Sequence, residues 1–290
     1  MNLEKIYEKN YKKLLFVSSG LLVVALIILG INYASTGSVI DKDISLKGGI
    51  SITIDKEGLN AAEIFSFLTQ KYPDVNVRTL TDLSSRKNIG LIIESSDASE
   101  ADLKAAFKEK IDFTEKEYSA EIYSSSFSDA FFRQLIYVLI FSFILMAIVV
   151  WITFRTFIPS IAVILAAITD ILVTIAVLSL FHFRISSGGI TALLLVIGYS
   201  IDTDILLTTR LLKRREEGPF YDRLKHSMTT GLTMTFAAIA ALMVGYFIAI
   251  PIELKQIFLI ISIALFFDII TTYGGNAGIL ITYCKKKNIT

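Results

Sequence analysis

Six long apolar runs dominate this sequence, and each can cross the ~30 Å hydrocarbon core of a membrane as an α-helix. A helix satisfies its backbone hydrogen bonds internally, as lipid requires. We therefore predict an α-helical polytopic membrane protein with six transmembrane helices. The runs are Leu14–Ala34, Leu135–Phe154, Pro159–Phe181, Ile190–Leu212, Thr229–Ile250 and Ile257–Tyr283. The first run exceeds the ~7–15 apolar residues of a signal peptide, so we expect it to be a retained anchor.

The basic residues of the short loops predict the orientation. They gather in the N-terminal segment, in the loop 213–228 and in the tail 285–287. Because such loops stay in the cytoplasm, we expect a multi-pass protein of the cytoplasmic membrane with both termini cytoplasmic. Residues 220–228 are predicted to form a short amphipathic helix at the interface. No basic stripe indicates binding to nucleic acid.

Three regions follow from this topology. Residues 1–34 are an N-terminal cytoplasmic segment with the first transmembrane helix. Residues 35–128 are polar and predict a small extracytoplasmic α+β domain. Residues 129–290 predict a five-helix transmembrane domain with a short cytoplasmic tail.

The small domain is predicted to have the order βαββαβ, which is typical of a ferredoxin-like split βαβ unit. Asn60 with Glu63 and Ser99 with Asp102 mark the starts of its two helices, which end near Tyr72 and Lys110. The expected strands are Leu46–Asp55, Val75–Leu80, Ile89–Glu94 and Glu117–Ser124, with a polar turn at Asp82–Asn88.

Acidic residues inside the apolar runs are the candidate functional residues. A carboxylate at the bilayer centre costs at least ~2.5–3.5 kcal/mol, so such residues usually mark an ion route. Asp202 and Asp204 in the fourth run point about 200° apart on a helix, so both cannot face lipid. Asp170 and Asp268 lie midway along the third and sixth runs, and Arg210 follows Asp202 by eight residues.

We predict that these five residues form a proton or ion pathway, with Asp202 and Arg210 as its core. A static ion pair of Asp202, Asp204 and Arg210 is the alternative, and Thr169 and Thr174 can satisfy Asp170 locally. Asp268, near two threonines and two glycines, is equally compatible with helix packing. Gly198 is expected to allow a neighbouring helix to approach closely.

The fourth run resembles a known family. Its sequence Gly198-Tyr-Ser-Ile-Asp-Thr-Asp204, with Arg210, is similar to the fourth-helix signature of the SecF branch of the SecD/SecF family, in the RND superfamily. The stretch 167–174 resembles the family's third helix, and Lys47-Gly48-Gly49 resembles the start of its outer domain. The resemblance covers most of the chain and is to the archaeal type.

The resemblance implies an auxiliary subunit of the Sec protein translocase. Members pair with SecD, associate with the SecY-containing translocon and act on a translocating polypeptide within the lipid bilayer. Ion flow through the helices is thought to drive movement of the outer domains. No cofactor is implied.

Two other classes of membrane protein also place acids inside their helices. An RND-type exporter of lipids or small molecules usually has much larger outer domains. An intramembrane aspartyl protease pairs a Tyr-Asp motif with Gly-x-Gly-Asp, whereas this sequence has Ile201-Asp202 and Phe267-Asp268. We expect no catalytic residue and no enzyme activity. We also expect no metal site, since His182 and His226 fall in loops on opposite sides of the membrane.

Overall fold

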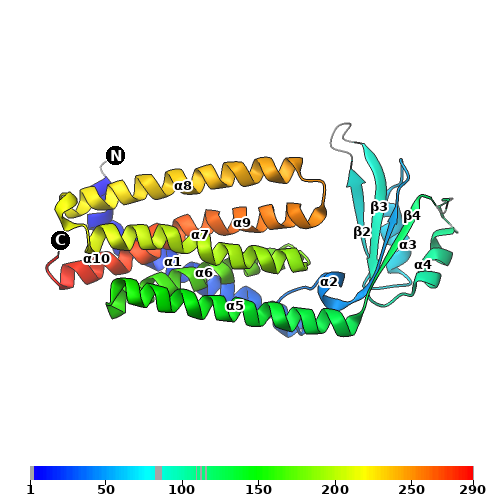
Figure 1. The fold of residues 1–290 in the computed structure, drawn as a ribbon, viewed down its shortest axis with the longest axis horizontal. Helices are drawn as coiled ribbons and strands as arrows, with labels where there is room; N and C mark the ends of the chain where they lie inside the picture. The colour runs from blue at the N-terminus through cyan, green and yellow to red at the C-terminus, as the bar shows by residue number, and fades with distance from the viewer. Residues whose placement is uncertain (1–2, 82–86, 109, 112, 115, 290) are drawn as a thin grey trace. The chain divides into compact units, whose positions relative to one another are not determined.

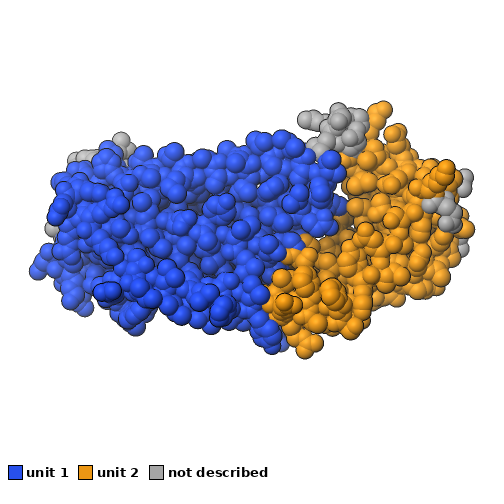
Figure 2. Space-filling model, viewed as in Figure 1, with its two compact units in different colours: residues 1–41, 137–184, 188–290 blue, residues 42–136, 185–187 orange. Residues whose placement is uncertain are grey.

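The computed structural model describes residues 3–81, 87–108, 110, 111, 113, 114 and 116–289. The chain divides into two compact units (Figure 2). Unit 1 comprises residues 1–41, 137–184 and 188–290, and unit 2 comprises residues 42–136 and 185–187. Unit 2 therefore includes a three-residue piece of the loop between the third and fourth long helices, which no sequence pattern predicts.

Six helices of the described chain are long and apolar enough to cross a membrane, as predicted. The helices are α1 (Leu3–Thr36), α5 (Ser125–Phe154), α6 (Phe157–Leu180), α7 (Ser187–Leu212), α8 (Phe220–Ile248) and the joined segments α9 (Ile252–Ile270), η2 (Thr271–Asn276) and α10 (Ala277–Lys286) (Figure 1). A 3-10 turn, η1 (Arg215–Glu217), precedes α8. The separate interfacial helix predicted over 220–228 is wrong, because these residues are the first turns of α8.

Within unit 1, α6, α7 and the last span are the buried helices, whereas α1, α5 and α8 expose most of their surface. Helices α8 and α9 run side by side (Figure 1). Helix α1 packs closely on η2 and α10 because glycines face it there. A Cβ on Gly275 would lie 2.5 Å from Ser18 Oγ, and one on Gly278 would lie 3.1 Å from Leu15 Cβ.

Unit 2 contains a four-stranded antiparallel sheet in the order β2-β3-β1-β4. The strands are β1 (Gly49–Ile54), β2 (Asn76–Thr81), β3 (Asn88–Ser95) and β4 (Tyr118–Tyr123). Two helices, α3 (Ala61–Thr69) and α4 (Glu100–Lys108), complete the predicted order of strands and helices. Most of the polar turn predicted at 82–88 lies outside the described residues.

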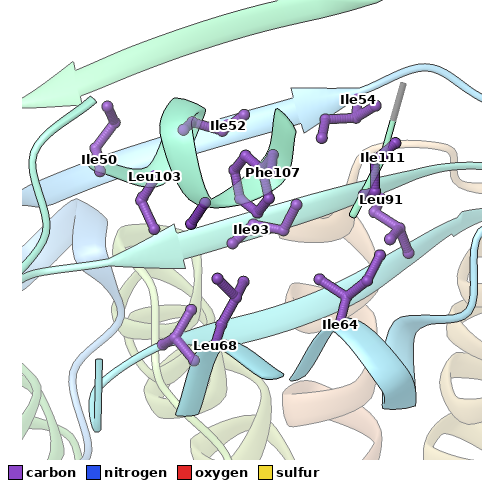
Figure 3. Close-up of a cluster of buried hydrophobic side chains, with 12 residues drawn as sticks. Ile50, Ile52, Ile54, Ile64, Leu68, Leu91, Ile93, Leu103, Phe107 and Ile111 are labelled. Atoms are coloured by element: carbon purple, nitrogen blue, oxygen red, sulfur yellow. The ribbon is translucent and has the colours of Figure 1, made fainter. Parts of the chain in front are cut away.

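Buried and partly buried residues alternate along β1, which explains how this unit buries its core. Ile50, Ile52 and Ile54 are buried on one face, and the residues between them are only partly buried. Ile64 and Leu68 of α3 and Leu103 and Phe107 of α4 join the same cluster, together with Leu91 and Ile93 of β3 (Figure 3). The side chain of Asn60 accepts a hydrogen bond from the Ala62 amide at 3.1 Å, which confirms the predicted start of α3.

The first strand begins later than predicted. A short helix, α2 (Ile44–Lys47), occupies the start of the expected strand, because the Asp43 carboxylate accepts a 2.6 Å hydrogen bond from the Ile44 amide. Gly48 then adopts a φ of 85°, and a Cβ at this position would lie 2.5 Å from Ser125 Cα. The Gly-Gly pair is therefore required by backbone geometry.

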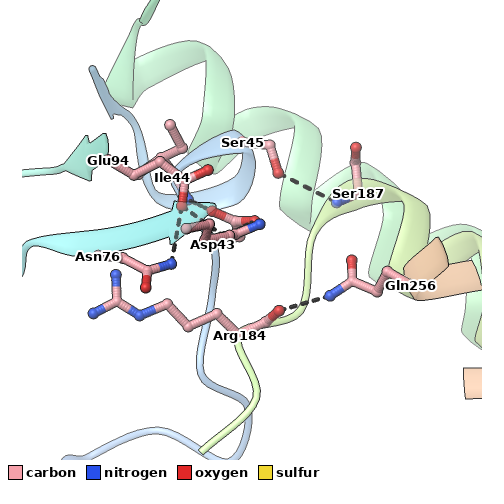
Figure 4. Close-up of polar contacts among 9 residues, drawn as sticks. Asp43, Ile44, Ser45, Asn76, Glu94, Arg184, Ser187 and Gln256 are labelled. Carbon is pink, nitrogen blue, oxygen red and sulfur yellow. Dashed lines mark hydrogen bonds and ion pairs between the residues drawn. The ribbon is translucent and has the colours of Figure 1, made fainter. Parts of the chain in front are cut away.

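The three residues 185–187 belong to unit 2 through contacts with its first segment. The Asp43 amide donates to the Ile185 carbonyl at 3.0 Å, and the Ser187 amide donates to Ser45 Oγ at 3.3 Å (Figure 4). The Asp43 carboxylate also pairs with Arg78 at 3.0 Å, and Arg78 pairs with Glu94 at 2.6 Å. Residues that lead directly into α7 are thus part of the small unit's polar network.

Candidate functional site

Three carboxyl groups from three different spans are buried in the middle of unit 1. Asp170 lies on α6, Asp204 on α7 and Asp268 on α9, and each side chain is at most 1% exposed. Sequence spacing placed these acids midway along their helices. The structure adds that hydroxyl and amide side chains connect them into one cluster, which we call the carboxylate cluster (Asp170, Asp204 and Asp268).

Asp170 takes both of its side-chain hydrogen bonds from other helices. Ser200 of α7 donates to Oδ2 at 2.5 Å, and Thr271 of η2 donates to Oδ1. Local satisfaction by Thr169 and Thr174, the alternative drawn from the sequence, is wrong. Thr169 donates to the Leu165 carbonyl and Thr174 to the backbone carbonyl of Asp170, as hydroxyls on helices often do.

Asp268 and Asp204 share a donor. Thr272 lies 2.9 Å from Asp204 Oδ1 and 3.2 Å from Asp268 Oδ1. Thr203 donates to Asp268 Oδ2 at 3.0 Å, and Asn276 Nδ2 donates to Asp204 Oδ1 at 2.7 Å. A change in the charge of one carboxyl group is therefore felt at its neighbour through a common hydroxyl.

The donors Thr271, Thr272 and Asn276 all lie on η2, a π-helix within the last span. Short π-helical segments inside α-helices are frequent at functional sites. Sequence reasoning noted the polar and glycine-rich character of this segment, but it did not assign these residues to the site. The signal was available, because three polar side chains follow Asp268 within eight residues of an otherwise apolar run.

The predicted core of the pathway, Asp202 and Arg210, is placed differently. Asp202 lies on an exposed face of α7, opposite to the buried Asp204, as the helical geometry predicted. Both residues are described, and the structure shows no ion pair between them. Arg210 is half-buried with its Nε unpartnered, and its backbone carbonyl accepts a 3.2 Å hydrogen bond from Arg223. The structure therefore brings together Asp170, Asp204 and Asp268, and leaves Asp202 and Arg210 apart from them.

Gly198 lies on the same exposed face of α7 as Asp202. A Cβ on Gly198 would meet no atom of the described chain within 4 Å. A helix that packs against Gly198 would have to belong to another chain, so the packing role predicted for this glycine remains a prediction.

Several polar atoms at the cluster have no hydrogen-bond partner among the described residues. They are Asp204 Oδ2, Asn276 Oδ1, Thr208 Oγ1 and Tyr273 Oη. Among the described residues no Lys or Arg forms an ion pair with the carboxylate cluster, and no group of His, Cys, Asp and Glu is arranged to hold a metal ion. The site is thus acidic and oxygen-rich, which suits it to proton exchange.

This arrangement defines a multi-pass membrane protein with a polar, acidic centre and a small α+β unit inserted after the first span. Residues 102–286 match the family model of the protein-export membrane protein SecD/SecF, C-terminal. The chain belongs to the SecD/SecF family. This membership confirms the resemblance seen in the fourth run and favours protein export over the two other classes weighed from the sequence.

Two curated relatives match over more than nine-tenths of their length, and a third over a smaller share. The protein-export membrane protein SecF of Methanolacinia petrolearia is 34% identical, over 92% of this chain and 91% of its own. SecF of Methanocaldococcus jannaschii is also 34% identical, over 96% and 97% of the two chains. The protein translocase subunit SecF of Borreliella burgdorferi is 27% identical over 79% of each chain.

A solved structure shares the fold. The crystal structure of SecDF, a translocon-associated membrane protein from Thermus thermophilus, superposes with a TM-score of 0.71 at 18% identity. The match covers 97% of this chain and 38% of the solved chain. This chain therefore corresponds in fold to rather more than a third of that longer protein.

Proposed function

We propose that this chain is a SecF-type auxiliary subunit of the Sec translocase, and that its carboxylate cluster couples proton flow to protein export across the cytoplasmic membrane. Membership of the SecD/SecF family supports the first part. The second part rests on one observation: three buried carboxyl groups on three helices are held by hydroxyl and amide donors, two of them share Thr272, and no Lys or Arg of the described chain is paired with them.

Electrostatics makes such a cluster suited to proton transfer. Three unpaired negative charges at this depth would repel one another and would lack the solvation that water gives a carboxylate. Taking up a proton relieves this cost, and releasing it restores the repulsion. Because the carboxyl groups stand on α6, α7 and α9, each change alters the forces that hold these helices together.

The structure also supports a route from the cluster to the small unit. Helix α7, which contains Asp204, begins at Ser187, and residues 185–187 belong to unit 2. A movement of α7 is therefore passed through the chain itself into the network of Asp43 and Arg78. We infer that unit 2 is an extracytoplasmic ferredoxin-like domain that moves with this helix and handles the translocating polypeptide.

We infer that SecD covers the exposed face of α7. Leu195, Gly198, Tyr199 and Asp202 recur at helical spacing on that face and are exposed, although Asp202 is charged and Gly198 small. A lipid-facing carboxylate is costly, so a polar partner helix is the favourable neighbour. The structural relative is a SecDF protein, which supports this pairing and association with the SecY-containing translocon in the lipid bilayer. In this scheme the subunit is not an enzyme, and both termini lie in the cytoplasm.

The test is the substitution Asp204→Asn. Both hydrogen bonds to Asp204 go to Oδ1, and Oδ2 has no partner in the described chain, so an asparagine keeps both bonds and removes only the ionisable group. We expect a normally inserted protein whose export activity falls to that of cells without the subunit. The measurement is pulse-chase secretion of a reporter at matched membrane abundance.

The matched control is Asp222→Asn, which removes an exposed acid near the start of α8 and should leave export unchanged. Asp202→Asn, tested beside it, distinguishes the buried cluster from the exposed face of α7. Wild-type export from Asp204→Asn would leave the carboxylate cluster as a structural feature only.

A further inference from the structure

A small cavity lies beside the carboxylate cluster, on the side of α1. It has a volume of about 40 Å³ and is enclosed by α1, α6, η2 and α10. Most of its lining is apolar, but five hydroxyl or amide side chains are part of the wall, namely Ser18 and Ser19 of α1, Thr169 of α6, and Thr271 and Asn276 of η2. An apolar packing defect would not be expected to collect five hydroxyl and amide groups inside a membrane-spanning bundle.

The cavity has the size and chemistry to hold water. A site for one water needs ~10–15 Å³ of such volume and two to four polar partners. Asn276 Oδ1 is buried and has no hydrogen-bond partner in the described chain, while its Nδ2 is bound to Asp204. A buried amide oxygen normally accepts a hydrogen bond, and a water in this cavity can donate it.

Two side chains in the cavity wall each contact one member of the carboxylate cluster. Thr271, in the cavity wall, donates to Asp170, and Asn276 donates to Asp204. A water bound here would be separated from each carboxyl group by one hydroxyl or one amide.

The α1 residues of the cavity wall lie a short way along the helix from its lysines. Ser18 is the polar residue of the cavity wall nearest to Lys13, which it follows by five residues, ~8 Å along a helix. Charged lysines of this kind anchor a helix end at the membrane interface, where water is plentiful. The distance from that interface to the cavity is therefore about one and a half helical turns.

We propose that this cavity binds water and is the route by which water from the lysine-bearing end of α1 reaches Asp170 and Asp204. The inference rests on the proposed proton coupling and deepens it, because it assigns the side from which the cluster exchanges protons. Thr271 and Asn276 are positioning residues that hold the two carboxyl groups against the cavity. The glycines of η2 keep α1 close enough to enclose the cavity.

Silver-ion accessibility tests the route directly, since Ag⁺ is small enough to follow water and reacts with thiols. The full chain is used in membrane vesicles, with its only cysteine, Cys284, replaced by serine. Thr169→Cys places a thiol in the cavity wall, and Ile279→Cys places a second one there from α10. We expect silver to abolish the later labelling of both thiols by a maleimide after denaturation.

The matched control is Val173→Cys, which is buried on the same helix one turn further along and lies outside the cavity wall. It should keep its maleimide labelling. A larger side chain in the cavity wall, introduced by Ser19→Leu, should narrow the cavity and protect Thr169→Cys from silver. Continued labelling of both cavity thiols after silver would overturn the route, and so would equal loss at Val173→Cys.

The result of the silver experiment can be told apart from the result of the export assay. Silver-resistant cavity thiols together with an export defect in Asp204→Asn would overturn the water route and leave proton coupling standing. Reactive cavity thiols with normal export in Asp204→Asn would support the route and overturn the coupling.

Discussion

At the scale of single residues, the carboxylate cluster depends on donors that come from other helices. Asp170 is held by Ser200 and Thr271, and neither is near it in sequence. Hydroxyl groups suit this role because they can donate to a carboxylate and can turn to accept from a carboxylic acid. The network can therefore persist through a change in protonation, which a fixed lysine or arginine partner would oppose.

Thr271→Val tests the contribution of one such donor. The replacement keeps the shape of the side chain and leaves Asp170 without one of its two hydrogen bonds. We expect a loss of ~1–3 kcal/mol in stability, because a buried acceptor loses its partner. The measurement is thermal unfolding of the purified full chain. Thr282→Val, which removes only a hydrogen bond to the Gly278 carbonyl, should change stability by less than ~0.5 kcal/mol.

At the scale of elements, η2 is the segment that distinguishes the last span from an ordinary helix. Its π-helical turns place Thr271, Thr272 and Asn276 on the carboxyl groups while Gly274 and Gly275 face α1. The same six residues thus present polar groups to one neighbour and a surface without side chains to another. Close approach of α1 is a direct consequence, as small residues allow in membranes.

Gly275→Ala should disturb this approach. The new Cβ would lie 2.5 Å from Ser18 Oγ, so α1 or the serine must shift. We expect the free energy of unfolding to fall by ~1–3 kcal/mol, the usual cost of overpacking. Gly198→Ala is the matched control, because it adds the same methyl group where nothing lies within 4 Å and helix propensity improves by up to ~1 kcal/mol. Equal melting temperatures for the two variants would contradict the close packing of α1.

In unit 2, Arg78 is the central cation of the polar network. It bridges Asp43 and Glu94, whose side chains are 7% and 9% exposed. Arg78→Ala would remove the cation that bridges two nearly buried carboxylates. We expect the free energy of unfolding to fall by up to ~3 kcal/mol. This is the lower end of the cost of breaking a buried ion pair, because the Arg78 side chain is 25% exposed.

The control for Arg78 is Lys47→Ala. It removes the Lys47–Asp74 pair, in which the lysine side chain is 47% exposed, and should cost at most ~1 kcal/mol. Hydrogen exchange of β2 and β3 in the full chain locates the effect. Unchanged protection in Arg78→Ala would show that the sheet does not depend on this cation.

At the scale of the whole molecule, the chain passes between the two units at residues 41/42, 136/137, 184/185 and 187/188. Each passage is a peptide connection through which displacement of one unit acts on the other. The passages at 184/185 and 187/188 lie between α6 and α7, the helices of Asp170 and Asp204. The proposed coupling of proton flow to movement of unit 2 needs such a connection.

Cysteine labelling tests the proposed topology. With Cys284 replaced by serine, Ser66→Cys on the exposed side of α3 and Lys287→Cys in the tail provide one thiol each. In intact cells, a membrane-impermeant maleimide should label only Ser66→Cys, because the basic tail is expected in the cytoplasm. The reverse pattern would invert the orientation of all six spans.

The sequence by itself determined the number of long apolar helices, the order of strands and helices in unit 2, and the positions of the acids midway along the apolar runs. These features depend on local patterns: apolar length, alternation as in β1, and helix starts such as Asn60. It also predicted correctly that Asp202 and Asp204 point apart, because helical geometry is fixed at 100° per residue.

Only the tertiary structure decided which of these acids lie together. Packing of α6, α7 and the last span buries Asp204 and turns Asp202 outward, so the cluster is completed by Asp268 and the donors of η2 and does not include Arg210. Likewise, residues 185–187 join unit 2 through hydrogen bonds of backbone amides, which no pattern of side chains predicts. Contacts between segments far apart in the chain depend on how the helices pack, and local spacing contains no information about that.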